Sequence, residues 1–343
     1  MGHSRIFACG VTLLLLAGLS VGQSSADRHV WLPIKTYRGY LLVVEGSIGD
    51  AQHRKLLIDT AAYPSVIDEE LAAKLHLSST TDELRVVGQT LKSAASEVPV
   101  LKVGPIEVRN VSVQVQDLRA IGKKLGTHVD AIIGLDVLAG SSFRIDYEQQ
   151  QMVFGPVGVL QESTPLKQMG RMTYVDTAIN GQKARLLVGS AASNTTVFGN
   201  VAPKIHATAG KPLQSTNLGG PVDLQQVHVE RFALGAMDLG PLEIQVTDSE
   251  NLRTLPVDGL LSTGAMGFGQ VAFDFEHQML SWAMAGKPRK PVTALRDSRA
   301  ANTGLPVQGN DPMSTAADGC SGLQRSADCR SATPRPRQPR ERN

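Results

Sequence analysis

The sequence has little cysteine, and what it has lies outside the middle of the chain. Only three cysteines occur in 343 residues: Cys9 in an apolar N-terminal stretch, and Cys320 and Cys329 near the C-terminus. No disulfide framework is therefore expected to hold the fold, although Cys320 and Cys329 can pair in an oxidising compartment. The eight histidines are scattered without a paired spacing on a helix, so we expect neither a metal site nor another cofactor.

An excess of one charge is also missing. Lysine and arginine total 34 and aspartate and glutamate 32, which gives a formal net charge of +2 at pH 7. A chain so nearly neutral has no electrostatic reason to bind nucleic acid or an anionic membrane surface as its general partner. Long apolar runs are absent after the N-terminal stretch, so no further spanning segment is expected. With 42% hydrophobic residues, the chain is long enough for two domains with real cores.

The N-terminal stretch has the three parts of a secretory signal. Arg5 supplies a positive start, Ile6 to Leu19 is apolar, and Ser24 to Ala26 offers a small-residue cleavage site. An uncleaved anchor is the alternative, but the apolar run of about 14 residues is shorter than the roughly 20 that a spanning helix needs. We therefore expect residues 1–26 to be removed as a signal peptide. The protein is then exported, to the periplasm or outside the cell, and keeps no stable membrane span.

The middle of the chain is predicted to be almost entirely β. Short alternating or apolar runs recur between Gly, Asn and Asp turns, which is typical of strands. One helix is expected from Ile67 to Leu75, starting at Asp68 with two glutamates in its first turn. Residues 287–343 are rich in Pro, Ser, Arg and Ala and cannot bury enough apolar area to offset their ordering entropy, so a disordered tail is predicted. The clearest predicted strands are 40–45, 55–59, 98–103 and 111–115.

The sequence contains an internal repeat. Four segments of the first half recur in the same order about 130 residues later. Such matches indicate two copies of one β-rich unit, which we place at residues 38–156 and 170–286. An N-terminal extension at 27–37 precedes the first copy, and a linker at 157–169 joins the two. The matching pairs are 55–62 with 185–192, 101–104 with 232–235, 130–138 with 258–266, and 143–147 with 271–275.

Two motifs of the first copy resemble those of retropepsin-like and pepsin-like aspartic proteases. Residues 56–61, Leu-Leu-Ile-Asp-Thr-Ala, are similar to the apolar-Asp-Thr-Gly/Ala turn of that family. Residues 131–138, Ala-Ile-Ile-Gly-Leu-Asp-Val-Leu, are similar to its apolar-apolar-Gly-x-Asp motif. The resemblance covers both repeats, roughly 250 residues. It implies an all-β fold of two tandem retropepsin-like (acid protease) β-barrel lobes related by internal duplication.

The resemblance also assigns roles to residues of the first copy. Asp59 takes the place of one of two catalytic aspartates, which share a proton, activate a water and polarise the scissile carbonyl. Thr60 is similar to the residue whose hydroxyl supports the paired turns, and Ala61 holds a position where only a small side chain leaves room for water and substrate. Ile133 and Gly134 belong to the strand under this turn. Without the repeat, a turn or helix-cap aspartate is an equally good interpretation of Asp59.

The second copy departs from the family at the position of the aspartate. It reads Gly189, Ser190 and Ala191 there, so a chain folded on itself brings Asp59 opposite a glycine. Asp258 aligns with the other motif of the first copy and is interpreted as a turn residue. Three outcomes are open. A homodimer can pair two Asp59 side chains, a lone Asp59 can be helped by a neutral group such as Ser190, or the protein can bind peptide without cleaving it.

Each copy has a candidate for the hairpin flap that closes over substrate in the family. In the first copy it is Leu84–Ala94 with Gly88 at its tip, and in the second Asn217–Pro221 occupies the same place. A plain surface hairpin is an equally good interpretation. The first interval has no tyrosine like the flap tyrosine of pepsin.

Two functions follow from these residues. The first is an exported aspartic endopeptidase, a hydrolase that cleaves a peptide or protein substrate through water activated by Asp59. The alternative is a catalytically inactive relative that binds an extended peptide or a partner protein in the groove between the lobes. The intact Asp59 favours the enzyme, whereas Gly189 favours the binding protein.

Overall fold

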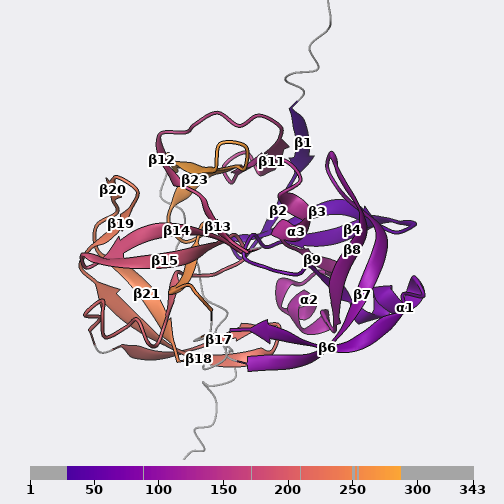
Figure 1. Ribbon diagram of the computed structural model, residues 1–343, viewed down its shortest axis with the longest axis horizontal. Coiled ribbons are helices and arrows are strands. Elements are labelled where there is room, and N and C mark those ends of the chain that lie inside the picture. Colours follow the sequence, from indigo (N-terminus) through magenta and orange to yellow (C-terminus); the bar gives the residue numbers. More distant parts are fainter. Residues whose placement is uncertain are drawn as a thin grey trace, which may run out of the picture. The chain divides into compact units, whose positions relative to one another are not determined.

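The computed structural model describes residues 29–87, 89–170, 172–208, 210–248, 252 and 255–286. Within them are 24 strands and three short helices, which confirms the all-β fold class (Figure 1). The strands form three sheets, one in each copy of the repeat and one that the copies share. None of the helices described is long and apolar enough to cross a membrane. The expected signal peptide, the tail with its two cysteines, and Gly88 lie outside the described residues.

The first lobe is a sheet of eight strands that closes into a barrel. In sheet order they are β2 (Lys35–Tyr37), β3 (Leu41–Ile48), β4 (Ala51–Ile58), β9 (Ala131–Ile133), β5 (Val66–Asp68), β8 (Ile106–Gln116), β7 (Gln89–Val103) and β6 (Ser79–Val86). The barrel closes because β3 pairs with β7 as well as with β4. The four strands predicted most clearly overlap β3, β4, β7 and β8.

Strand β3 is apolar on both faces, and each face packs against a different core. Leu42 and Val44 belong to the main hydrophobic core, whereas Leu41 and Val43 belong to a second cluster in the first lobe. Successive side chains of a strand point to opposite faces, so a strand covered on both sides reads as a continuous apolar run. The second cluster forms one wall of the pocket described below.

The predicted helix at Ile67–Leu75 is wrong at its start. Helix α1 spans Glu69–Lys74, and Ile67 and Asp68 end strand β5. Backbone pairing of β5 with β8 and β9 holds these two residues extended. Asp68 then acts as the N-cap, because its carboxylate accepts the N–H of Glu70 at 3.1 Å. Helices α2 (Arg119–Leu125) and α3 (Leu135–Leu138) were not predicted.

The second lobe repeats the plan in a sheet of ten strands. They are β17 (Lys211–Asn217), β18 (Gly220–Val229), β21 (Leu242–Thr247), β16 (Thr196–Phe198), β22 (Gly259–Ser262), β15 (Gln182–Gly189), β14 (Met172–Ile179), β19 (Phe232–Leu234) and β20 (Met237–Asp238), with β13 (Lys167–Met169) paired to β14. β15 runs parallel to β22 as β4 runs parallel to β9. Strands β18 and β19 of the second lobe together correspond to the single strand β7 of the first lobe.

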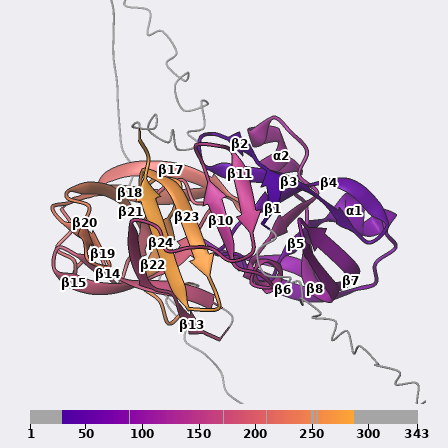
Figure 2. The ribbon, with the colours of Figure 1, turned by 90° about the horizontal axis from the view of Figure 1, so that it is seen from above.

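The third sheet joins two strands of each copy with one strand of the N-terminal extension and one strand of the segment between the copies. In order they are β1 (Val30–Pro33), β11 (Gln151–Phe154), β10 (Phe143–Asp146), β23 (Phe268–Asp274), β24 (Met279–Met284) and β12 (Glu162–Pro165). Figure 2 shows β10 and β11 beside β23 and β24. At the junction Phe143 lies opposite Phe273, with ring centroids 4.9 Å apart. The segment expected as a linker, 157–169, thus contributes β12 and β13, and the N-terminal extension contributes β1 and β2.

Candidate functional site

Two equivalent turns meet between the lobes, one after β4 and one after β15. The Thr60 hydroxyl donates to the carbonyl of Val188 at 2.7 Å, and the Ser190 hydroxyl donates to the carbonyl of Ile58 at 2.9 Å. Each of these hydroxyls also accepts the backbone N–H of the other residue at 3.1 Å. Thr60 and Ser190 are both buried, so four hydrogen bonds hold the turns together away from the surface.

The strand β9 lies directly under the first turn. The N–H of Asp59 donates to the carbonyl of Ile133 at 3.0 Å. At Gly134 a Cβ atom would stand 2.2 Å from the carbonyl oxygen of Ala62, so only glycine allows this approach. The N–H of Gly134 donates to the hydroxyl of Ser65, which itself donates to Asp136 at 2.7 Å. The carboxylate of Asp136, which belongs to the second motif of the first copy, therefore supports the turn.

The second lobe supports its turn without a carboxylate. Ser262 stands where the first lobe has Gly134, and its hydroxyl donates to the carbonyl of Ala192 at 2.7 Å. Gly264 takes the place of the supporting aspartate, and a Cβ there would lie 2.5 Å from Cβ of Tyr40. The altered motif of the second copy has therefore become a packing contact with the first lobe.

Asp258 has a structural role, as the turn interpretation expected. Its carboxylate accepts the N–H of Arg185 at 2.8 Å. Asp130 accepts the N–H of Lys55 at 2.7 Å in the first lobe in the same way. Each aspartate thus ties the start of the lower strand to the strand that leads into the turn.

Asp59 is a single acid on an otherwise apolar floor. Its carboxylate accepts the N–H groups of Ala61, at 3.0 Å, and of Ala191 from the opposite turn. Burial raises the pKa of Asp59 above its ordinary value, because it outweighs these two amide donors. Opposite, a Cβ on Gly189 would lie 3.3 Å from Cβ of Ala61 and 2.9 Å from Cδ1 of Leu260. Leu260 thus covers the place where a second carboxyl group would be built.

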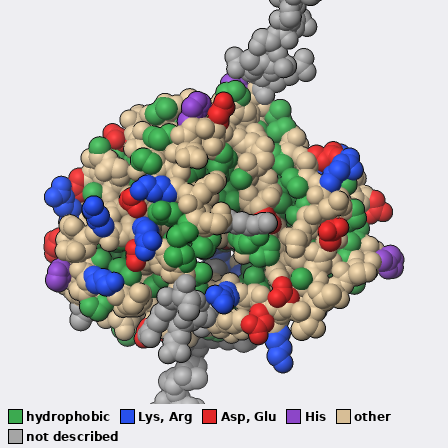
Figure 3. Space-filling view, in the orientation of Figure 1, with side chains coloured by type: hydrophobic (Ala, Val, Ile, Leu, Met, Phe, Trp, Pro, Cys, Tyr) green, Lys and Arg blue, Asp and Glu red, His purple; other side chains and the backbone are tan. Residues whose placement is uncertain are grey.

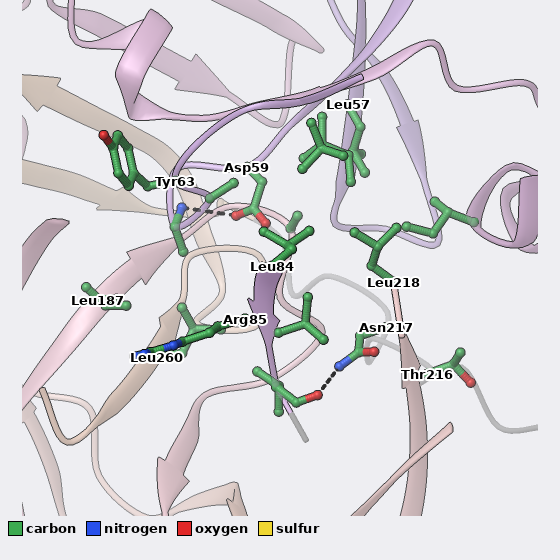
Figure 4. A pocket seen from close by; sticks show the side chains of 18 of the residues that line it. Leu57, Asp59, Tyr63, Leu84, Arg85, Leu187, Thr216, Asn217, Leu218 and Leu260 are labelled. Atoms are coloured by element: carbon green, nitrogen blue, oxygen red, sulfur yellow. Dashed lines mark hydrogen bonds between the residues drawn. The ribbon is translucent and has the colours of Figure 1, made fainter. Parts of the chain in front are cut away.

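The floor belongs to a pocket of about 320 Å³ lined by both lobes. Figure 3 shows hydrophobic side chains around the hollow at the centre of this face, and Figure 4 shows leucines of both lobes around Asp59. Among the described lining residues Asp59 is the single acid, and Arg85 and Lys124 are the two cations. The apolar walls include Leu57, Leu84, Ile121, Leu125, Ile132, Leu187, Phe198, Leu218, Leu252 and Leu260.

Both flap candidates are hairpins in the structure. Strands β6 and β7 pair from one end to the other up to Val86 and Gln89, and β17 and β18 pair up to Asn217 and Gly220. Residues next to both tips, Val87 and Asn217 among them, line the pocket. Gly88 itself lies outside the described residues.

Ser190 is not placed to help Asp59 with a proton. Its side chain is fully buried, and its hydroxyl already donates to Ile58 and accepts from Thr60. The idea that a neutral Ser190 assists a lone acid is therefore wrong, because the hydroxyl has no hydrogen left to share. No cluster of three metal-binding side chains occurs in the part of the chain described.

Some residues of the pocket were not found from the sequence. No functional role was predicted for Leu260 or for the helix α2 residues Ile121 and Lys124, because their places depend on tertiary packing. The internal repeat did give one indication, because Leu260 aligns with Ile132 of the first copy. Both line the pocket, one from each lobe.

A model of the aspartyl protease family matches residues 44–137 and 175–265, which together make up more than half of the chain. The curated proteins contain no match to the sequence. Each matched region holds one of the two turns that meet on the floor of the pocket. The chain therefore belongs to the aspartyl protease family, as two tandem retropepsin-like lobes.

Proposed function

We propose that the protein binds an extended segment of a peptide or partner protein in the pocket between its lobes, without cleaving it by the two-carboxylate mechanism. The observation that carries this proposal is the pair of Gly189 and Leu260 opposite Asp59. That mechanism needs one ionised and one protonated carboxyl group at the same time. A single carboxyl group supplies one state or the other.

The walls of the pocket favour an extended polypeptide as the ligand. They combine apolar side chains with residues next to the tips of two β-hairpins. Extended peptides are bound in such places through their main chain, while alternate side chains enter apolar pockets. The protease-like architecture thus serves recognition even without the second acid.

A second candidate is slow hydrolysis by Asp59 alone, and the retained carboxyl group favours it. Above its raised pKa the ionised Asp59 can take a proton from water. No described acid is then present to polarise the scissile carbonyl. General acid–base groups typically contribute about 10²- to 10⁴-fold each, so we expect a rate lower by roughly that factor than with two acids.

Pairing of two chains through Asp59 would need the lobes of one chain to separate first. Thr60 and Ser190 already use the surface that two first lobes would share. Measurement of mass in solution tests this route. A strict monomer that cleaves substrate would contradict a dimeric active site.

The proposed function is tested with reduced, carboxymethylated α-lactalbumin as an unfolded polypeptide. Binding is followed by fluorescence anisotropy and cleavage by mass spectrometry between pH 4 and 7. We expect saturable binding without fragments. Fragments made by the natural chain but not by Asp59→Asn would establish the second candidate instead. Absence of both binding and cleavage would contradict both.

Helix α2 offers a matched pair of variants for the binding test. Ile121 lines the pocket, whereas Lys123 on the same helix is exposed and does not. We expect Ile121→Ser to weaken binding about tenfold, since it removes one buried apolar side chain from the wall. Lys123→Ser should leave binding unchanged. Equal affinities of the two variants would place the binding site elsewhere.

We further propose that the protein is exported after removal of residues 1–26. The positive start and the short apolar run at the N-terminus support this. The intact mass of full-length protein expressed in a bacterium tests it. A product that begins near residue 27 in the periplasm or medium is expected, and a product that keeps Met1 in the cytoplasm would contradict export.

A further inference from the structure

We propose that the surface of the first lobe carries a binding site for a phosphate group, formed by Lys35, Tyr37, Lys55 and Thr127. The four residues come from β2, from β4 and from the segment that follows α2. None of them is among the residues that line the pocket between the lobes. The site therefore goes beyond the proposed function and does not depend on it.

Two lysines converge on two neutral hydroxyl groups. The ammonium group of Lys55 donates to the hydroxyl of Thr127 at 2.8 Å. The side chains of Thr127 and Lys35 both approach the hydroxyl of Tyr37, and Nζ of Lys35 lies 5.4 Å from the centre of the Tyr37 ring. Both lysines are exposed, whereas Tyr37 and Thr127 are partly buried. The two hydroxyl groups therefore lie together, each contacted by a lysine that a ligand in solution can reach.

The sheet of the first lobe places three of these side chains on one face. Lys35 pairs with Val43, and Val43 pairs with Leu57, which lies two residues after Lys55. Side chains two residues apart on a strand point to the same face, so Lys35, Tyr37 and Lys55 share a face of the sheet. The ring of Tyr37 packs against the hydrophobic cluster on this face, which includes Val43 and Leu57. This packing holds the tyrosine hydroxyl between the strands and the end of α2.

The acids of this region are already engaged by other groups. Glu45 lies directly opposite Lys55 in the pairing of β3 with β4, yet its carboxylate is hydrogen-bonded to His53. The buried Asp130 accepts the backbone N–H of Lys55 and pairs with Arg54. Within the described residues neither lysine of the site forms an ion pair with a carboxylate. Two positive charges are thus held close to each other without a counter-charge.

The ionisation of Tyr37 reflects the positive charge around it. Burial raises the pKa of a tyrosine, yet the pKa of Tyr37 lies below its ordinary value. The hydrogen bonds of Thr127 and Lys35, together with the charges of Lys35 and Lys55, outweigh the effect of burial. Groups that stabilise a phenolate oxygen in this way would also stabilise the oxygens of a bound anion.

A doubly charged tetrahedral anion suits this set of groups. The two ammonium groups supply two positive charges and several N–H donors, and lysine is a common ligand of phosphate. The hydroxyl of Tyr37 adds an O–H donor, whereas a carboxylate would neutralise only one of the two lysines. Repulsion from the C-terminus of α2 is reduced, because Arg38 donates to the carbonyl of Lys124 at 3.0 Å.

Titration with inorganic phosphate tests the site, followed by the amide resonances of the protein in ¹⁵N–¹H NMR spectra. At pH 8 a phosphate group carries nearly two charges, and we expect saturable shifts of the Tyr37 and Thr127 resonances. Sodium chloride of equal ionic strength should leave these resonances in place. Equal shifts with chloride, or no shift with phosphate, would overturn the site.

A parallel titration with glycerol 3-phosphate separates two sources of the phosphate group. Both compounds are expected to shift the same resonances, because the site contacts the phosphate oxygens they share. Tighter binding of the ester would assign the site to a phosphate ester, and tighter binding of the free ion would assign it to inorganic phosphate.

A matched pair of double variants tests whether these lysines hold the anion. Lys35→Gln combined with Lys55→Gln should weaken phosphate binding at least about tenfold, because two charged hydrogen-bond donors are lost. Lys183→Gln combined with Lys204→Gln makes the same change in net charge on exposed lysines of the second lobe, and it should leave binding unchanged. Equal weakening by both double variants would mean attraction by net charge alone and would overturn the site.

The ionisation of Tyr37 gives a second, independent readout. The ultraviolet absorbance of tyrosinate follows it, measured as the difference between the natural chain and Tyr37→Phe. A bound phosphate group neutralises the two lysines, so saturating phosphate should raise the pKa of Tyr37 by roughly half a pH unit at constant ionic strength. An unchanged pKa would place the anion elsewhere and would contradict the proposal.

Discussion

Asp59 and Gly189 face each other across two turns that are otherwise matched atom for atom by the hydrogen bonds of Thr60 and Ser190. The scaffold of an aspartic protease is therefore present while one of its acids is missing. The place of the missing carboxyl group is covered by an apolar side chain, because Leu260 lies over Gly189. The proposed function therefore rests on this position.

The ionisation of Asp59 should affect stability in a defined direction. Its pKa is higher in the folded protein than in the unfolded chain because of burial, so the folded state binds the proton more tightly. Stability should therefore be complete at low pH and fall as the pH rises from about 4 through the raised pKa. We expect Asp59→Asn to melt at a higher temperature than the natural chain at pH 7 and at a similar temperature at pH 3.

Thermal unfolding at both pH values measures this difference. Asp258→Asn is not a suitable comparison, because that carboxylate accepts a backbone N–H. Glu97→Gln, on an exposed side chain, serves as the comparison. An Asp59→Asn variant that is less stable at pH 7 would mean that the carboxylate is favoured by its surroundings.

Restoring the second acid should restore the chemistry. In Gly189→Asp the new Cβ would approach Cδ1 of Leu260, the end of a flexible side chain that can rotate away. Two carboxyl groups would then face each other and share a proton. We expect fragments of carboxymethylated α-lactalbumin at acidic pH, at a rate at least about 100-fold above that of the natural chain.

The isosteric variant Gly189→Asn serves as the control for this gain. It makes the same steric demand on Leu260 but supplies no second acid. Fragments from both variants would point to a contaminating protease or to a change of shape. Fragments from neither, with both variants folded, would mean that the turns no longer hold a productive distance.

Much of the floor could be predicted from the internal repeat and from the resemblance of its motifs to a known family. The repeat placed Gly189 opposite Asp59, and the motif gave Thr60 its supporting role. The contact of Leu260 with Gly189 inside the second lobe and the double use of the Ser190 hydroxyl between the lobes could not be predicted, because both depend on tertiary packing. A single sequence carries no direct signal for such contacts between distant segments.

At the scale of secondary structure, the strands were predicted better than the helices. Apolar runs such as 40–45 and 111–115 mark strands because covered strands need apolar side chains on one or both faces. Helix α1 is shorter than expected, since Ile67 and Asp68 are held in the sheet by β8 and β9. Asp68, which was expected to begin the helix, is instead its N-cap.

Asp68 joins two elements, so its loss should be costly. The buried carboxylate accepts the N–H of Glu70, which caps α1, and the N–H of Leu118 at 3.0 Å, just before α2. Asp68→Ala leaves both donors unpaired, and we expect it to lower the free energy of unfolding by about 1–3 kcal/mol. Urea denaturation measures the change.

The neighbouring Glu70 provides the comparison on the same helix. It pairs with Lys74 on the surface, where such pairs contribute little. Glu70→Ala should leave the midpoint of unfolding almost unchanged. Equal losses for the two variants would mean that helix formation, and not the buried cap, sets the effect.

At the scale of the whole described chain, the two lobes share one core. The main hydrophobic cluster runs through both lobes and includes Phe143, Phe273 and Trp282 of the shared sheet. Separate barrels would each need a core of their own, whereas here strands of the first half pair with strands of the second half in one sheet. We therefore expect one cooperative unfolding transition and not two.

Phe143→Ala tests this coupling. The residue belongs to the first half, is fully buried and stacks on Phe273 of the second half, so its removal should cost about 3–5 kcal/mol. In a Trp31→Phe background the fluorescence of Trp282 reports on the second half. This fluorescence and circular dichroism should shift together to lower urea. A shift in circular dichroism without one in fluorescence would show that the halves unfold separately.

The shared sheet also decides what each half would do on its own. If the chain were divided between β11 and β12, the first half would expose strand β10 and the second half β23 along a bare edge, and bare edges seek another strand. Two first halves joined through β10 would place one Asp59 across from another, with identical turns on both sides. In the intact chain the second half, with its own and different turn, occupies that position. Because the two halves are covalently linked, the residue opposite Asp59 is Gly189 and not a second aspartate.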